Sequence, residues 1–119
     1  MSDIKKTLSD VCQAVHRKKG EKISVLDVRE ISSFTDFFLI CEGSNRRQNQ
    51  AICDEIVEAL KRDHSVRPLH LEGYDHAEWI LIDYVEFVAH IFSKDTRQFY
   101  KLEKLWSDGI ELEPQALTA

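Results

Sequence analysis

The sequence lacks the features that mark membrane and secreted proteins. Its longest uninterrupted apolar run extends only from Phe37 to Cys41, far short of the roughly 20 residues that span a bilayer. The first residues lead into an amphipathic pattern and not into the apolar core of a signal peptide. We therefore expect no membrane contact and a cytoplasmic location.

Cysteine is also scarce. Cys12, Cys41 and Cys53 lack Cys-x-x-Cys spacing and fall at apolar positions of predicted helices and a strand. A buried free cysteine behaves as a small hydrophobic residue. We therefore expect three reduced thiols in the core, and we assign no nucleophile.

Basic residues are few in the second half of the chain. Residues 1–71 carry 12 Lys and Arg against 11 Asp and Glu, whereas residues 72–113 carry 4 against 10. An acidic protein, here with net charge −5, does not gain the counterion release that drives phosphate-backbone binding. This disfavours nucleic acid as the main ligand and favours a basic protein partner.

What the sequence does contain is a series of helix and strand patterns of the size of one domain. The run Phe37–Cys41 has no polar alternation, which predicts a central strand with both faces covered. We predict an α/β sandwich with a mixed five-stranded sheet and flanking helices over residues 1–107, and a flexible C-terminal tail over residues 108–119. The expected elements lie at about residues 4–19 (helix), 23–28 and 36–42 (strands), 46–62 (helix), 66–71, 78–83 and 86–92 (strands), and 94–106 (helix).

The last predicted helix carries an apolar stripe of Phe99, Leu102, Leu105 and Trp106. This spacing favours packing on the sheet. The other interpretation is that part of the stripe forms a dimer surface.

A phosphate-binding turn is the most enzyme-like feature. Gly43-Ser44 between a strand and a helix could hold a phosphate on free backbone amides. A nucleotidyl-transferring enzyme would also need paired carboxylates on the following strand, and that strand ends in the single acid Glu72. We therefore interpret Gly43-Ser44 as an ordinary helix cap. His70, Glu72 and His76 lack a third His or Cys at ligand spacing, so we predict no metal, no cofactor and no catalytic residue.

Arg46 and Arg47 stand in the first turn of a predicted helix, where the helix dipole disfavours positive charge. A surface pair or a salt bridge to the acidic half explains them. Contact with RNA or with a second protomer is the alternative.

The segment from Glu72 to Glu86 is the predicted binding site. It holds five acids, no Lys or Arg, and three aromatic residues, which suits a basic protein surface. For Trp79 the alternative is a place in the core. The predicted partner-binding residues are Glu72, Asp75, Trp79, Asp83, Tyr84 and Glu86.

Several segments, taken together, resemble the ribosomal silencing factor (RsfS, Iojap-like) family over about residues 4 to 107. These are Thr35–Ser44, Arg47-Gln48 with Ala51-Ile52, Glu72-Gly73, Trp79–Tyr84, His90–Phe92 and Arg97–Trp106. No single segment is specific, but the set in this order is.

The resemblance implies a nucleotidyltransferase-like fold without transferase activity, a homodimer, and repression of translation when nutrients are short. It implies that the protein binds the large ribosomal subunit through the basic protein numbered fourteen in its series, with a minor contact to ribosomal RNA, and so blocks the small subunit. The alternatives are a large-subunit assembly adaptor and a residual nucleotide-binding enzyme.

One position departs from the family pattern. The family has Gly before the second acid of the Asp-x-Gly-Asp turn, whereas this chain has Val85. Because a β-branched residue tolerates positive φ poorly, we expect a turn of another type here.

Overall fold

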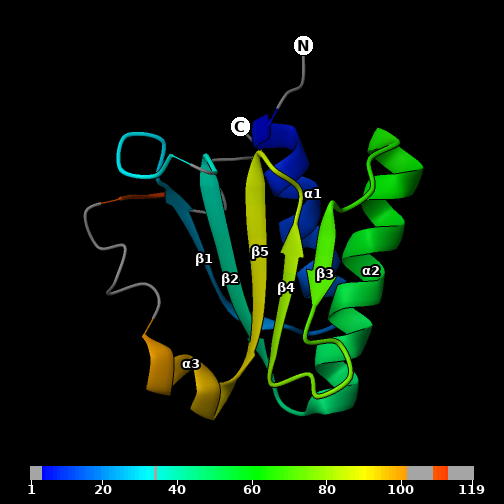
Figure 1. The fold of residues 1–119 in the computed structure, drawn as a ribbon. Coiled ribbons are helices and arrows are strands. Elements are labelled where there is room, and N and C mark those ends of the chain that lie inside the picture. Colours follow the sequence, from blue (N-terminus) through cyan, green and yellow to red (C-terminus); the bar gives the residue numbers. More distant parts are fainter. Residues whose placement is uncertain (1–3, 34, 102–108, 113–119) are drawn as a thin grey trace.

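The computed structural model describes residues 4–33, 35–101 and 109–112, which form one mixed sheet and three helices (Figure 1). The six strands lie in the order β3-β4-β5-β2-β1-β6. The elements are α1 (Ile4–Arg17), β1 (Glu21–Asp27), β2 (Phe37–Gly43), α2 (Arg46–His64), β3 (His70–Glu72), β4 (Trp79–Asp83), β5 (Phe87–Ser93), α3 (Lys94–Tyr100) and β6 (Ile110–Leu112).

Strand β2 is the central strand, as predicted. It runs parallel to β5 and antiparallel to β1, and every one of its residues is buried. A strand that is covered on both faces needs apolar side chains in both directions, which explains the missing alternation in Phe37–Cys41.

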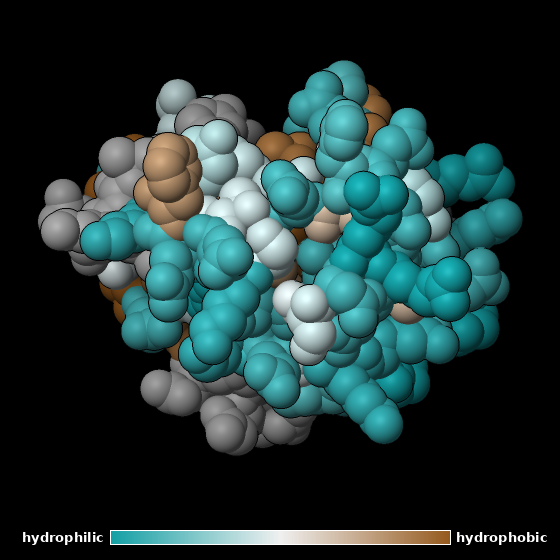
Figure 2. Space-filling view, turned by 90° about the horizontal axis from the view of Figure 1, so that it is seen from below, coloured by the Kyte–Doolittle hydropathy of each residue, from teal (hydrophilic) through white to brown (hydrophobic). Residues whose placement is uncertain are grey.

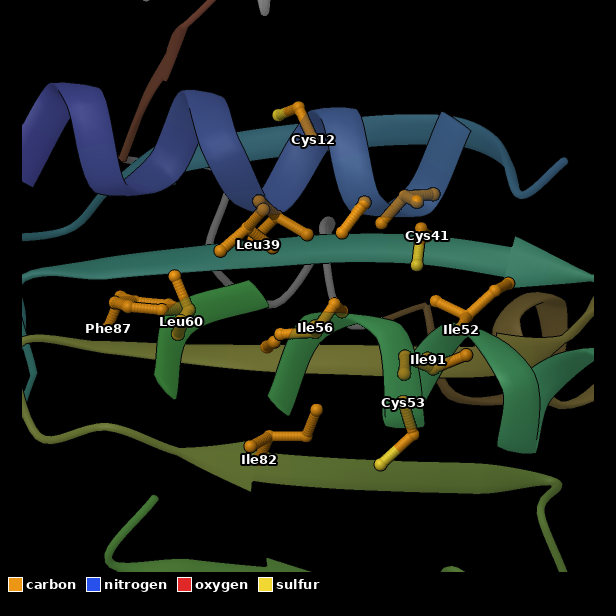
Figure 3. Close-up of a cluster of buried hydrophobic side chains, with 14 of the residues drawn as sticks. Cys12, Leu39, Cys41, Ile52, Cys53, Ile56, Leu60, Ile82, Phe87 and Ile91 are labelled. Carbon is orange, nitrogen blue, oxygen red and sulfur yellow. The ribbon is translucent and has the colours of Figure 1, made fainter. Parts of the chain in front are cut away.

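Helices α1 and α2 cover one face of the sheet (Figure 1). The buried residues of α1, among them Leu8, Val11 and Val15, meet those of α2 and the strands in one hydrophobic core. Figure 3 shows this core around Leu39, with Ile56 reaching it from α2. Full burial of each such side chain stabilises the fold by about 1.5–3 kcal/mol.

The three cysteines are free and buried, as expected. Burial raises the pKa of the Cys12 thiol to about 11 and those of Cys41 and Cys53 to about 12. Thiols with such pKa values stay protonated at neutral pH and are poor nucleophiles.

The other face of the sheet carries a second, smaller cluster. Phe38 and Ile40 of β2 pack there with Phe92 of β5, and the partly buried Trp79 and Leu81 of β4 join them. The sheet therefore lies between two apolar clusters, one on each face.

The predicted count of five strands is wrong. A sixth strand, β6, pairs antiparallel with β1, and Ser24 Oγ donates a hydrogen bond to Glu111 Oε1 across this pair (3.0 Å). Three residues are too few to show a strand period, so the sequence pattern did not reveal β6. It lies within residues 108–119, which we predicted to form a tail; residues 108 and 113–119 lie outside the described residues.

The end of the predicted last helix is only partly described. Ser93 caps α3 as expected, but Leu102, Leu105 and Trp106 lie outside the described residues. Phe99 does not pack on the sheet as predicted, because its side chain is 80% exposed. No helix in the described ranges is long and apolar enough to cross a membrane.

Candidate functional site

Strand β4 separates the predicted site residues into two groups. Trp79 begins the strand and Asp83 ends it, so their Cα atoms are about 13 Å apart at about 3.3 Å per residue. The loop before Trp79 lies at the lower end of Figure 1 and the turn after Asp83 at the upper end. The segment from Glu72 to Glu86 therefore presents its predicted residues at two separate places, one at each end of β4.

At the upper end, Tyr84 is not an exposed anchor, contrary to our expectation. It is 7% exposed and stacks on Phe87, with ring centroids 4.9 Å apart. Its hydroxyl has no hydrogen-bond partner among the described residues, and burial raises the pKa of that hydroxyl. Tyr84 therefore belongs to the core beneath α2, whereas Glu86 is exposed beside it.

The turn itself keeps positive φ although its central residue is β-branched. Val85 has φ 75°, and the Glu86 amide donates to the Tyr84 carbonyl, which is the hydrogen bond of a γ-turn. The reason given for expecting another turn type, that a β-branched residue would avoid positive φ here, is therefore wrong. Asp83 Oδ1 accepts from the Val85 amide (2.8 Å) and Thr35 Oγ1 donates to the Val85 carbonyl (3.0 Å), so the surroundings hold the strained residue in place.

At the lower end, Trp79 joins the interior to the surface. Its indole Nε1 donates to Nδ1 of His90 (3.0 Å), and its ring contacts Phe92 inside and Tyr100 outside at centroid distances of 5.0 and 4.8 Å. The two interpretations of Trp79, core residue and surface anchor, thus each describe one part of the same side chain.

His90 is the buried partner of that indole. It is 4% exposed and lies against Phe38 and Phe92, and within the part of the chain that the structure describes its Nε2 has no hydrogen-bond partner. Because Nδ1 accepts a hydrogen bond, the neutral ring carries its proton on Nε2. Burial lowers the pKa of His90 to about 4.

A groove of about 590 Å³ opens beside Trp79. One wall comes from the 73–78 loop and the other from α3, where Phe99 and Tyr100 are exposed. The residues that line it are Gly73, His76, Glu78, Trp79, Asp95, Thr96, Phe99 and Tyr100. We call the groove that these eight residues line the aromatic groove. It combines the aromatic rings of Trp79, Phe99 and Tyr100 with two carboxylates, and of the six predicted partner-binding residues only Trp79 is among these eight.

Local hydrogen bonds fix the 73–78 loop. Gly73 has φ 80°, and a Cβ there would lie 2.1 Å from the Trp79 carbonyl oxygen, so only glycine fits. Two side chains of helix α2 hold the loop in place. Asn49 Nδ2 donates to the Ala77 carbonyl (2.7 Å) and Gln50 Nε2 donates to the Tyr74 carbonyl (2.9 Å).

The second wall of the groove is fixed by the start of α3. Ser93 Oγ accepts from the Thr96 amide (3.3 Å), and the Ser93 amide donates to the Glu78 carbonyl (2.9 Å). This tie sets the distance between α3 and the loop.

The other predicted residues at this end lie near the groove but do not line it. Glu72 is exposed on β3 and Asp75 is exposed in the loop. Asp95, Phe99 and Tyr100 line the groove but were not among the predicted partner-binding residues. The signal for Phe99 was its place in an amphipathic stripe, which we assigned to packing on the sheet, with a dimer surface as the other interpretation.

The Gly43-Ser44 turn is a helix cap, as interpreted. Asn45 Oδ1 accepts from the Gln48 amide (2.8 Å), and the Ser44 amide donates to Gln48 Oε1 (2.5 Å). Side chains of the protein therefore occupy these amides.

The chemistry of a metal enzyme is not visible in the described residues. Within residues 4–33, 35–101 and 109–112, no three His, Cys, Asp or Glu side chains are grouped so that they could hold a metal ion. His70, Glu72 and His76 are each exposed, on β3 and in the loop.

These features define a small, single-domain α/β protein with a groove lined by aromatic and acidic side chains beside Trp79. Comparison with known proteins identifies the family. Residues 1–119 match the family model described as RsfS, ribosomal silencing factor during starvation. The chain therefore belongs to the RsfS family.

The relatives agree with this assignment. The chain is 44% identical over 102 residues to ribosomal silencing factor RsfS of Halalkalibacterium halodurans (84% of this chain, 86% of that protein) and 40% identical over 105 residues to that of Bacillus subtilis (88% of each). It is 30% identical over 95 residues to a mouse protein named mitochondrial assembly of ribosomal large subunit protein 1, covering 78% of this chain and 42% of that protein.

Solved structures share the fold. A crystal structure from Chromobacterium violaceum has TM-score 0.85 at 26% identity, covering 89% of this chain and 88% of that one. A second, from Bacillus halodurans, has TM-score 0.77 at 40% identity, covering 89% and 95%. The single-domain architecture with a six-stranded mixed sheet is thus that of its relatives.

Proposed function

We propose that this protein is a ribosomal silencing factor that binds the large ribosomal subunit, sterically blocks association with the small subunit, and so represses translation under nutrient limitation. The observation that carries the proposal is that relatives at 44% and 40% identity over most of the chain bear this name. We propose a non-enzymatic action, since occupying space at the subunit interface requires no chemical step. The proposal includes a cytoplasmic homodimer.

The proposed partner on the large subunit is its basic protein numbered fourteen, and the aromatic groove is the proposed place of contact. Phe99 and Tyr100 are exposed rings, and Glu78 and Asp95 lie in the same groove. Lys and Arg side chains of a basic partner can stack on such rings and pair with such carboxylates. Glu72 and Asp75 add negative charge near the groove.

The test of the function is subunit joining. Purified protein should co-sediment with isolated large subunits and reduce the fraction of joined ribosomes when small subunits are added. Unchanged joining at a protein concentration that saturates large subunits would refute the proposal.

The test of the site compares its two ends. Phe99→Ala removes an exposed ring from the groove and should weaken large-subunit binding by about tenfold or more, the effect of losing an interface anchor. Glu86→Lys probes the turn that also contains Asp83 and the buried Tyr84. The control is Ile31→Ala, which trims an exposed apolar residue in the loop after β1.

The outcomes separate the two ends. If Phe99→Ala binds like the control while Glu86→Lys binds weakly, docking occurs at the upper turn and the groove assignment is wrong. If both weaken binding, the partner extends along the whole of β4.

One observation favours a second function, that of a large-subunit assembly adaptor. The mouse relative is named for assembly of the large subunit. An adaptor would bind immature large particles in preference to mature ones. Equal binding to mature subunits, together with blocked joining, would exclude it.

A further inference from the structure

Helix α1 ends and helix α2 begins at the lower end of the molecule in Figure 1, and both of these helix ends carry basic residues. Gln48 Nε2 donates to the carbonyl oxygens of Lys18 and Lys19 (3.0 and 2.8 Å), which holds the two helix ends together. The basic end, as we call it, consists of Lys18, Lys19, Lys22, Arg46 and Arg47.

These five side chains are exposed, and most have no acidic partner. Lys18 lies 4.0 Å from Glu55, which Arg17 also contacts. Lys19, Lys22, Arg46 and Arg47 form no ion pair with any described residue. Of the two explanations that we preferred for the arginines, the salt bridge to the acidic half is not found among the described residues, and a surface pair is left.

The nearby acids do not cancel this charge. Glu42 is buried and already pairs with Arg97, with Nη1 and Oε1 3.3 Å apart. Glu21 is exposed on β1 beside Lys22 and is the acid closest to it in the chain. Four cations without an ion pair to a described residue therefore form a local basic surface on a protein of net charge −5.

The surface suits an extended polyanion better than a small anion. At the start of α2, Gln48 Oε1 and Asn45 Oδ1 already occupy the amides of Ser44 and Gln48, which leaves fewer backbone donors there for a single phosphate. The cations are instead spread over three segments. A row of separated phosphates, as in an RNA backbone, matches such a spread.

The basic end and the aromatic groove lie at the same end of the sheet. Helix α2 binds the 73–78 loop through Asn49 and Gln50, three residues from the arginines. Figure 2 looks onto this end and shows a largely hydrophilic surface. One bound particle could therefore be contacted by both.

We propose that the basic end contacts backbone phosphates of ribosomal RNA while the aromatic groove holds a basic ribosomal protein. This inference rests on the proposed function, since it takes the large subunit as the partner. It assigns the RNA contact to named residues and explains why an acidic protein keeps two arginines at a helix N-terminus, where the dipole disfavours them.

The test is the salt dependence of large-subunit binding by Arg46→Gln/Arg47→Gln. Each lost phosphate contact changes the affinity ratio between 50 and 200 mM salt by about threefold. The wild type should therefore lose about tenfold more affinity over this range than the double variant. The matched control is Lys61→Gln/Arg62→Gln at the opposite end of α2, which should keep the wild-type salt dependence.

A photo-crosslinking residue at position 19 identifies what lies there. Cross-links to RNA support the proposal, whereas cross-links to protein alone overturn it. Equal salt dependence in the wild type and the Arg46/Arg47 variant also overturns it. If the wild type itself does not bind large subunits, the proposed function fails, and this outcome is distinct from the others.

Discussion

Protonation of His90 should destabilise the fold in mildly acidic solution. The ring is buried among Phe38, Trp79 and Phe92, with no carboxylate among these contacts. A charged imidazolium there would lose its hydration without gaining a counter-ion, and Nδ1 could no longer accept the Trp79 indole hydrogen bond. The folded protein therefore holds His90 neutral.

The size of the effect follows from linkage. Burial lowers the pKa of His90 from 6.5 to about 4. Between these two pH values His90 is protonated in the unfolded chain and neutral in the folded chain. Stability thus falls as pH falls, by about 2 kcal/mol between pH 7 and pH 5 and by about 3 kcal/mol once the pH is below both values. The contribution is fully present only above about pH 6.5.

The assay is urea unfolding of the wild type and His90→Gln at pH 7 and pH 5. Glutamine stays neutral and can still accept the indole hydrogen bond, so the variant should lack this part of the pH dependence. The loss of stability between pH 7 and pH 5 is measured for each protein, and the loss in the variant is subtracted from that in the wild type. The contributions of the other four histidines, which both proteins share, then cancel. An equal loss of stability in both proteins would show that His90 is not held neutral by burial.

Two further predictions concern positive φ. Val85→Gly should raise the free energy of unfolding by about 1 kcal/mol, because relief of about 1–3 kcal/mol of strain exceeds the entropic cost of glycine. Val66→Gly is its control, and stabilisation of both or neither would contradict the reasoning. Gly73→Ala should lower the free energy of unfolding by about 2 kcal/mol or more, because the new Cβ would meet the Trp79 carbonyl. Asp75→Ala in the same loop should change it by less than about 0.5 kcal/mol, and equal effects would show that the loop adapts.

The elements that could be predicted are those whose pattern is long or whose end is marked. The unbroken apolar run of β2, the stripe of α1 and the cap at Asn45 each express a constraint within the segment itself. Strand β6 shows the limit, because its three residues form a strand only through pairing with β1. That partner is distant in sequence, so no local pattern reports it.

The candidate site was predicted in composition but not in geometry. The acidic and aromatic character of Glu72–Glu86 is a local property, and the sequence shows it directly. The spatial arrangement of these residues depends on two other things. One is the direction of β4, and the other is the position of α3, which comes after this segment in the sequence. Tyr84 illustrates this: it looks like a turn residue in sequence, but its ring turns inward onto Phe87.

Trp79 is the least suitable residue for testing the interface, although it is the most conspicuous one. Its indole holds the His90 ring from one side, and its face contacts Tyr100 on the other. Replacing it would leave a buried histidine nitrogen without a partner and would remove a groove ring at the same time. Lost binding could then reflect either change. Phe99 contacts Tyr100 but is largely outside the core, so its removal alters the surface alone, and the comparison with Glu86→Lys measures docking and not stability.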